Sequence, residues 1–85
     1  ASGSTYTAPA NGTFYFRKRS TAAGQYISLA NLSNNTFEEY YSSNSNQDFG
    51  ISMNVLKGVA INANYTFGGT THEFKFVYAE GENNV

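Results

Sequence analysis

The sequence predicts an all-β domain, a small antiparallel β-sandwich or jelly-roll-like fold, and two alternating stretches carry this prediction. Between Val59 and Phe67, apolar or aromatic residues at every second position alternate with alanine, asparagine and threonine. Alternation returns between Phe74 and Tyr78, after the Gly68-Gly69 pair. Successive side chains of a strand point to opposite faces, so both stretches indicate half-buried strands joined by a glycine turn. No segment has the periodicity of an amphipathic helix.

The first part of the chain predicts three strands. Ser4–Ala8 is a short strand that Pro9 ends, and Asn11-Gly12 is the strongest hairpin signal of the chain. Thr13–Arg19 is the second strand. Gln25–Leu32 is the third, with its leucine end just past the regular part.

The middle of the chain is less regular. Thr36–Tyr41 fits a strand or an irregular loop better than a helical turn. Ser42–Gln47 has no apolar residue and is therefore predicted to be an exposed loop. Phe49–Val55 alternates as a strand, and Lys57-Gly58 turns the chain into the strand that begins at Val59. We expect Glu80–Val85 to be a frayed tail.

This layout gives about seven strands at spacings of roughly 8–12 residues, which is the pattern of a sandwich or jelly roll. It shows no internal repeat. The predicted core consists of apolar residues that share one face of their strand. They are Phe14, Phe16, Ile27, Leu29, Ile51, Met53, Val55, Val59, Ile61, Phe74, Phe76 and Tyr78.

The length of 85 residues predicts one domain, with 1–4 as a linker remnant, 5–81 as the sandwich and 82–85 as a tail. A domain this small buries only roughly 60% of its unfolded surface and needs further stabilisation. The chain has no cysteine and one histidine, His72, so disulfides, thiolate metal sites and histidine-rich metal sites are excluded. Self-association remains as the stabilising device, and no cofactor is expected.

The net charge of -1 and the charged fraction of 13% argue against nucleic acid as a partner, because phosphate binding needs clustered Lys and Arg. The only basic run, Arg17-Lys18-Arg19, is predicted to be a solvated strand end. No apolar stretch approaches the roughly 20 residues of a membrane span, so no membrane insertion is expected. A neutral surface rich in amides and hydroxyls is typical of extracellular modules and virion proteins.

Catalytic and metal chemistry find little support. Glu38 and Glu39 are adjacent, so in a strand they point to opposite faces and cannot form a glycosidase pair. No nucleophile motif accompanies the single histidine, and no spaced run of acidic residues suits calcium. The sequence therefore predicts a protein that is not an enzyme and holds no metal.

Tyrosines next to an amide-rich loop are the strongest binding feature, because aromatic rings give contact area while amides and hydroxyls give hydrogen bonds. The predicted receptor-binding residues are Tyr40, Tyr41, Asn44, Asn46 and Gln47. The alternative is a plain solvated loop whose tyrosines pack into the core or a trimer axis. Tyr15 and Tyr26 lie opposite the core face, and we assign them to a trimer interface in preference to ligand binding.

Three segments, in this order, resemble the C-terminal head domains of tailed-bacteriophage tail fibres. They are Tyr6–Gly12 followed by an aromatic strand, the hairpin around Lys57-Gly58, and the ending Glu73–Gly81. The resemblance covers residues 5–81, and the layout is more loosely similar to the trimeric jelly rolls of the C1q and tumour-necrosis-factor type. Val55-Leu56 departs from the pattern, which would have a proline before the Lys-Gly turn.

The resemblance implies a homotrimeric tip at the distal end of a virion fibre, outside the cell. It would bind a bacterial surface polysaccharide or outer-membrane protein, and the family supplies no fixed binding residues. Two alternatives stay open. One is a carbohydrate-binding module of a secreted enzyme, although this chain lacks the tryptophan that such modules usually present. The other is a purely structural trimerisation domain.

Overall fold

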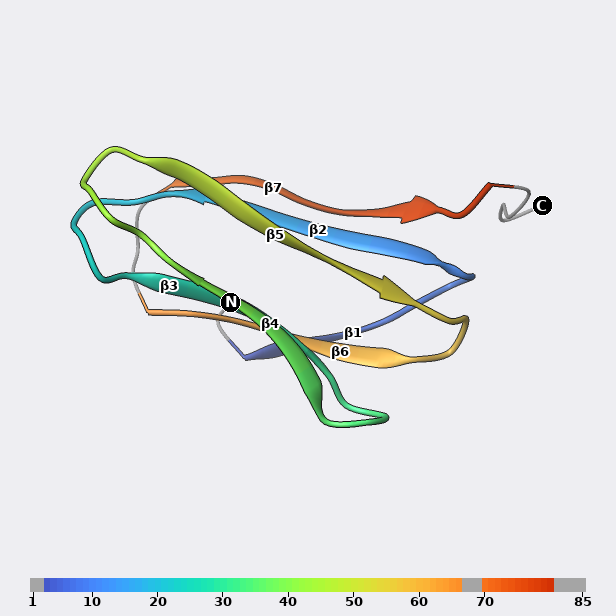
Figure 1. Ribbon diagram of the computed structural model, residues 1–85. Helices are drawn as coiled ribbons and strands as arrows, with labels where there is room; N and C mark the ends of the chain where they lie inside the picture. Colours follow the sequence, from blue (N-terminus) through green and yellow to red (C-terminus); the bar gives the residue numbers. More distant parts are fainter. Residues whose placement is uncertain (1–2, 67–69, 81–85) are drawn as a thin grey trace.

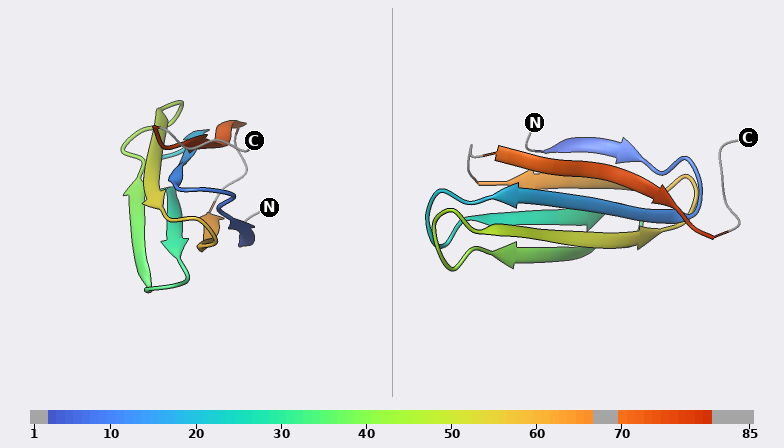
Figure 2. Two further views of the ribbon diagram at one scale, coloured as in Figure 1. Left: turned by 90° about the vertical axis from the view of Figure 1, so that its right-hand side faces the viewer. Right: turned by 90° about the horizontal axis from the view of Figure 1, so that it is seen from above.

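The computed structural model describes residues 3–66 and 70–80, which form seven strands and no helix. The strands make two antiparallel sheets that pack face to face, so the all-β prediction is confirmed (Figure 1). Their bounds are β1 Ser4–Thr7, β2 Gly12–Arg19, β3 Tyr26–Asn31, β4 Thr36–Tyr41, β5 Asp48–Val55, β6 Ala60–Tyr65 and β7 Thr70–Tyr78. One sheet has the order β1-β6-β3-β4 and the other β5-β2-β7. The strands of both sheets run along the long axis of the molecule (Figure 2).

The strand pairs are nested in the sequence. β3 pairs with β4, β2 with β5, and β1 with β6, so each pair encloses the previous one. The chain from β1 to β6 is therefore one long hairpin whose two arms run side by side and cross between the sheets together. β7 adds to the free edge of β2, and β6 joins β3 laterally.

The core lies between the inner faces of the two sheets. Of the predicted set, Phe14, Phe16, Ile27, Leu29, Met53, Val55 and Ile61 are buried, and Ile51, Val59, Phe74, Phe76 and Tyr78 are partly buried. The prediction missed Ala8, Ala10, Phe49 and Ala63. Phe74 ties the sheets together, because its ring lies 5.7 Å from that of Phe16 in its own sheet and 4.4 Å from that of Tyr6 in the other.

Several predicted boundaries are refined. Thr36–Tyr41 was predicted to be a strand or an irregular loop, and it is a strand. β7 begins at Thr70 rather than Phe74, because its first residues pair with the end of β2 beyond a register shift. The sequence prediction missed this part of the strand, since these residues are polar and show no hydrophobic alternation. Gly3 donates its N–H to Ala63 O at 2.7 Å, so the sheet begins within the expected linker. The predicted Gly68-Gly69 turn and the tail over 82–85 lie outside the described residues.

The two arms of the hairpin cross between the sheets at a corner made by residues 20–25 and 42–47. The two loops hold each other by reciprocal bonds. Ser20 N–H donates to Gln47 O at 2.8 Å, and Ser42 N–H donates to Gln25 O at 2.7 Å. Ser20 Oγ accepts from Gln47 N–H at 3.0 Å, and Ser42 Oγ accepts from Gln25 N–H at 3.1 Å. We call this arrangement the serine corner.

Each serine hydroxyl also donates to a carbonyl of the opposite loop. Ser20 Oγ donates to Asn44 O at 2.5 Å, and Ser42 Oγ donates to Ala22 O at 2.7 Å. Both serines are buried, and both hydroxyls use their donor and an acceptor site. The serine corner therefore links four backbone groups through two side chains.

The two loops of the serine corner share a short local pattern. Both loops carry Ser and Gln separated by four residues, and both have a positive φ just before the glutamine, 80° at Gly24 and 55° at Asn46. Few other residues match between the loops. Only the hydroxyl, the amide and a left-handed backbone are required here, so the remaining positions are free to differ.

We expect Ser20→Ala and Ser42→Ala to destabilise the fold by about 1–3 kcal/mol each, because each removes a buried hydroxyl that bonds both a carbonyl and a backbone N–H of the opposite loop. Urea unfolding measures the loss. Ser45→Ala, in an exposed part of the same corner, is the matched control and should change stability by less than about 0.5 kcal/mol. Equal effects at all three serines would contradict the bonding described.

Candidate functional site

The edge strand β4 is the most exposed regular element of the described chain. All six of its side chains are exposed, and Phe37 and Tyr41 keep 61% and 55% of their surface open. β4 hydrogen-bonds to β3 on one side only, so its other edge presents backbone groups that no strand pairs. An open strand edge and exposed aromatic rings are both features on which other chains or ligands can associate.

Tyr40 and Tyr41, the predicted receptor pair, point to opposite sides of β4. Tyr40 lies opposite Ile27, on the core side, and its ring is 5.8 Å from that of Phe49. Tyr41 lies opposite Tyr26 on the outer side, with the two rings 5.6 Å apart. The structure thus separates the predicted pair and joins Tyr41 to a residue that was assigned to the trimer interface.

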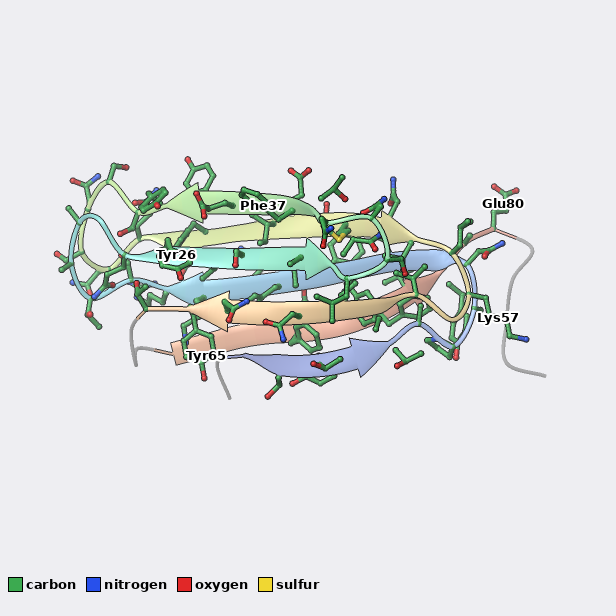
Figure 3. The ribbon with its side chains drawn as sticks, turned by 90° about the horizontal axis from the view of Figure 1, so that it is seen from below. Tyr26, Phe37, Lys57, Tyr65 and Glu80 are labelled. Atoms are coloured by element: carbon green, nitrogen blue, oxygen red, sulfur yellow. The ribbon has the colours of Figure 1, made fainter. Side chains whose placement is uncertain are left out.

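Tyr26, Phe37 and Tyr41 share the outer side of β3 and β4, and we call this surface the aromatic face (Figure 3). The other half of the same sheet side carries amides. Asn64 Nδ2 donates to Asn62 Oδ1 at 2.6 Å, and Asn62 Nδ2 donates to the Gly3 carbonyl at 2.8 Å. One sheet side therefore combines stacking surface with hydrogen-bonding groups.

The predicted loop residues serve the loop itself in large part. Gln47 Oε1 accepts the N–H groups of Ser43 and Asn44, at 2.8 and 3.1 Å, so the Gln47 side chain holds its own loop. Asn46 adopts the left-handed backbone that the turn needs and donates its N–H to Ser20 O. The Asn44 side chain is exposed. The receptor roles of these residues stay predictions.

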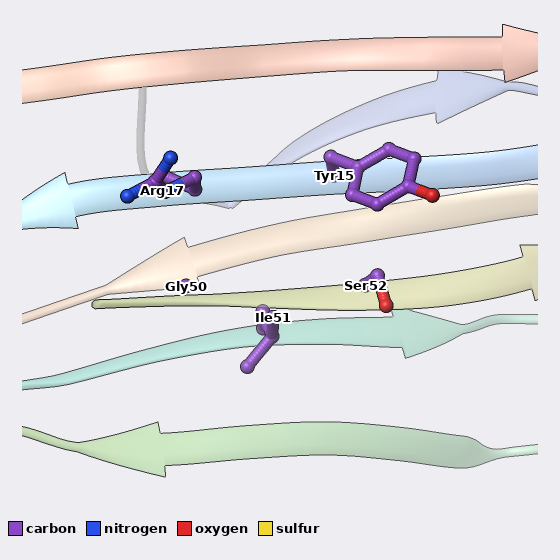
Figure 4. Close-up of a pocket in the computed structure, with 5 residues that line it drawn as sticks. All are labelled: Tyr15, Arg17, Gly50, Ile51 and Ser52. Carbon is purple, nitrogen blue, oxygen red and sulfur yellow. The ribbon is translucent and has the colours of Figure 1, made fainter.

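Tyr15 lies on the outer side of the other sheet, beside a shallow depression of about 250 Å³ (Figure 4). Gly50 forms part of its floor. A side chain is excluded at this position, because a Cβ would lie 2.5 Å from Arg17 Cγ and 2.9 Å from the Phe16 carbonyl oxygen. Arg17 and Ser52 line the same depression. Tyr15 and Tyr26 thus lie on opposite sides of the sandwich, and one flat contact cannot cover both.

The basic run is not uniformly solvated, so that prediction is wrong for Lys18. Strand alternation turns Arg17 and Arg19 outward and Lys18 inward, where it keeps only 2% of its surface exposed. Its Nζ lies 4.3 Å from the centroid of the Tyr65 ring, which is the geometry of a cation–π contact. Burial lowers the pKa of Lys18. Phe14, Phe16 and Lys18 occupy alternate positions of β2, and this spacing was the sequence signal that Lys18 faces the core.

Among the described residues, no group of three or more His, Cys, Asp or Glu side chains could hold a metal ion. That part of the chain also contains no helix long and apolar enough to cross a membrane. Comparison of the chain with protein-family models, curated proteins and solved structures found no match.

Lys18 makes stability depend on alkaline pH. Because its pKa in the folded state lies below the ordinary value of 10.5, the unfolded state binds more protons between the two values, and stability rises with pH in that window. The free energy of unfolding of the native protein should therefore increase relative to that of Lys18→Met as the pH rises toward 10.5. Urea unfolding of both at several pH values measures the gain. A constant difference would show that Lys18 is not desolvated.

Proposed function

We propose that this domain is a homotrimeric, non-enzymatic bacteriophage tail-fibre tip, exposed on the virion, that binds a receptor on the bacterial surface. The receptor is a polysaccharide or an outer-membrane protein. The observation that carries the proposal is β4, an edge strand with aromatic side chains on both sides and an open hydrogen-bonding edge. Such a strand gives a large contact area to a partner, and no described part of the chain covers it.

The nested pairing of β1 to β6 supports a jelly-roll winding. In a jelly roll, a long hairpin folds so that its paired arms alternate between two sheets. Here the β2–β5 pair lies in one sheet, and the β1–β6 and β3–β4 pairs lie in the other. This winding agrees with the looser resemblance of the sequence to trimeric jelly rolls of the C1q and tumour-necrosis-factor type.

The opposite placement of Tyr15 and Tyr26 supports a ring of three copies. In a cyclic trimer each copy uses one surface toward one neighbour and a different surface toward the other. Tyr15 would meet the neighbour on one side and Tyr26 the neighbour on the other. Since Tyr26 touches Tyr41, the receptor surface would then adjoin a contact between copies.

The chemistry of the aromatic face suits sugars and polar protein surfaces. Tyrosine and phenylalanine rings stack on apolar ring faces, and neighbouring amides and hydroxyls bond to polar groups. Asn62 and Asn64 continue the same sheet side toward β1. A neutral receptor polysaccharide would therefore find both kinds of group on one surface.

A carbohydrate-binding module is the second candidate, and the depression beside Tyr15 favours it. An aromatic ring, a guanidinium and a hydroxyl surround a shallow floor there. Such a module would work as a monomer. A purely structural trimerisation domain is the third reading, in which neither surface binds a receptor.

We expect Phe37→Ala and Tyr41→Ala to weaken adsorption to receptor-bearing bacteria at least about tenfold, because large exposed rings dominate contact energy. Labelled protein and a panel of bacterial strains measure adsorption. Val77→Ala, an exposed apolar residue on β7, is the matched control. Loss of adsorption on Tyr15→Ala alone would favour the carbohydrate-binding module. If adsorption is unchanged by every one of these substitutions while the trimer stays intact, a purely structural trimerisation domain is the one reading that remains.

The trimer has its own test. Light scattering should give three times the chain mass of 9.3 kDa, and the unfolding temperature should fall on dilution, because dissociation is favoured at low concentration. Tyr26→Arg should shift the mass toward the monomer. A clean monomer with an unfolding temperature that is constant over a wide dilution would contradict the trimer.

A further inference from the structure

A cleft of about 360 Å³ opens at the end of the sandwich opposite the serine corner. It lies between the hairpin loop that joins β3 to β4, at the bottom of Figure 1, and the turn that joins β5 to β6, at the right of the same view. Its walls include three asparagines and three aliphatic side chains. It is separate from the aromatic face and from the depression beside Tyr15.

The asparagine side chains of the cleft are oriented by bonds to the chain. Asn31 Oδ1 accepts the N–H of Ser33 at 2.8 Å, and Asn34 Oδ1 accepts the N–H of Thr36 at 3.1 Å. A backbone N–H can only donate, so in both residues the amide oxygen faces the chain and the NH₂ group points elsewhere. Asn54 Oδ1 likewise accepts the Thr13 hydroxyl at 2.6 Å.

The three NH₂ groups have no acceptor among the described residues. Asn31 is the informative case, because only 9% of its surface is exposed. No fully buried side-chain nitrogen or oxygen of the described residues lacks a hydrogen-bond partner, so the NH₂ group of Asn31 must reach solvent. The cleft that Asn31 lines is the opening available to it. The cleft therefore offers amide donors that the fold leaves unused.

The opposite wall of the cleft is apolar and uncharged. Leu56 keeps 68% of its surface exposed, Val59 is half-buried and Val55 is buried. No acidic or basic side chain lines the cleft. A cation would find no counter-charge there, and a carboxylate would lose hydration without gaining a cationic partner. The groups present suit a neutral ligand that carries an acceptor oxygen next to a small apolar group.

We propose that this cleft binds the acetamido group of an N-acetylated sugar. The acetamido carbonyl accepts hydrogen bonds from the asparagine NH₂ groups, and its methyl packs on Leu56 and Val59. The sugar ring extends out of the cleft past Ser33, whose hydroxyl bonds to ring hydroxyls. This site is separate from the aromatic face and does not rest on the proposed function.

Nuclear magnetic resonance of the ¹⁵N-labelled chain tests the site, because asparagine NH₂ groups give their own signals. N-acetylglucosamine and N-acetylgalactosamine serve as probes, and glucose serves as the control sugar. We expect saturable shifts of the Asn31, Asn34 and Asn54 side-chain signals with an N-acetylated sugar and none with glucose. Absence of saturable shifts, or equal shifts with glucose, would overturn the proposal.

Asn34→Asp is the sharpest variant, because it keeps the oxygen that accepts from Thr36 and replaces only the donor. It should weaken binding at least roughly tenfold and leave the fold intact. Ser45→Asp places the same negative charge in an exposed loop at the far end and should bind like the native protein. Leu56→Ser should also weaken binding, whereas Leu32→Ser, an exposed leucine outside the cleft wall, should not. Equal binding by Asn34→Asp and Ser45→Asp would reject the site.

Discussion

Two buried hydroxyls, those of Ser20 and Ser42, set the arrangement on which the rest of this structure depends. They sit where the chain passes from one sheet to the other, and a polar backbone at such a crossing must find partners away from water. Each hydroxyl bridges a carbonyl and an N–H of the opposite loop, so each loop completes the other.

The register of the sandwich follows from that corner. Arg19 pairs with Asp48 and Tyr41 pairs with Tyr26 directly beside it. A slip of one residue would turn every core side chain of the strand to the solvent side. The same topology explains why β4 is exposed, because a sheet of four strands packs on a sheet of three. Within residues 3–66 and 70–80, β5 is the one strand of the opposite sheet that lies near β4. The exposed aromatic strand is thus a consequence of an unequal sandwich.

The sequence predicted the features that local alternation controls. The strand class and most of the core followed from which residues share a face. The exposed loop predicted over 42–47 is confirmed for 43–46, whereas Ser42 is buried. Three other features were not predicted. Lys18 belongs to a basic run in the sequence, yet strand alternation places it in the interior against the Tyr65 ring. Gln47 reads as a surface amide, yet it holds its own loop. Asn31 and Asn34 lie at the tip of the long hairpin, and they meet Asn54 only when this tip folds beside the end of β5.

Amide hydrogen exchange is the measurement that tests the central claim most directly, because it reports the stability of each backbone bond. The N–H groups of Ser20, Gln25, Ser42 and Gln47 should exchange as slowly as those of the central strand β2, through global unfolding only. The exposed N–H of Ser45 in the same corner should exchange fast. Fast exchange at all five amides would contradict the account, because the serine corner would then be an ordinary pair of surface loops.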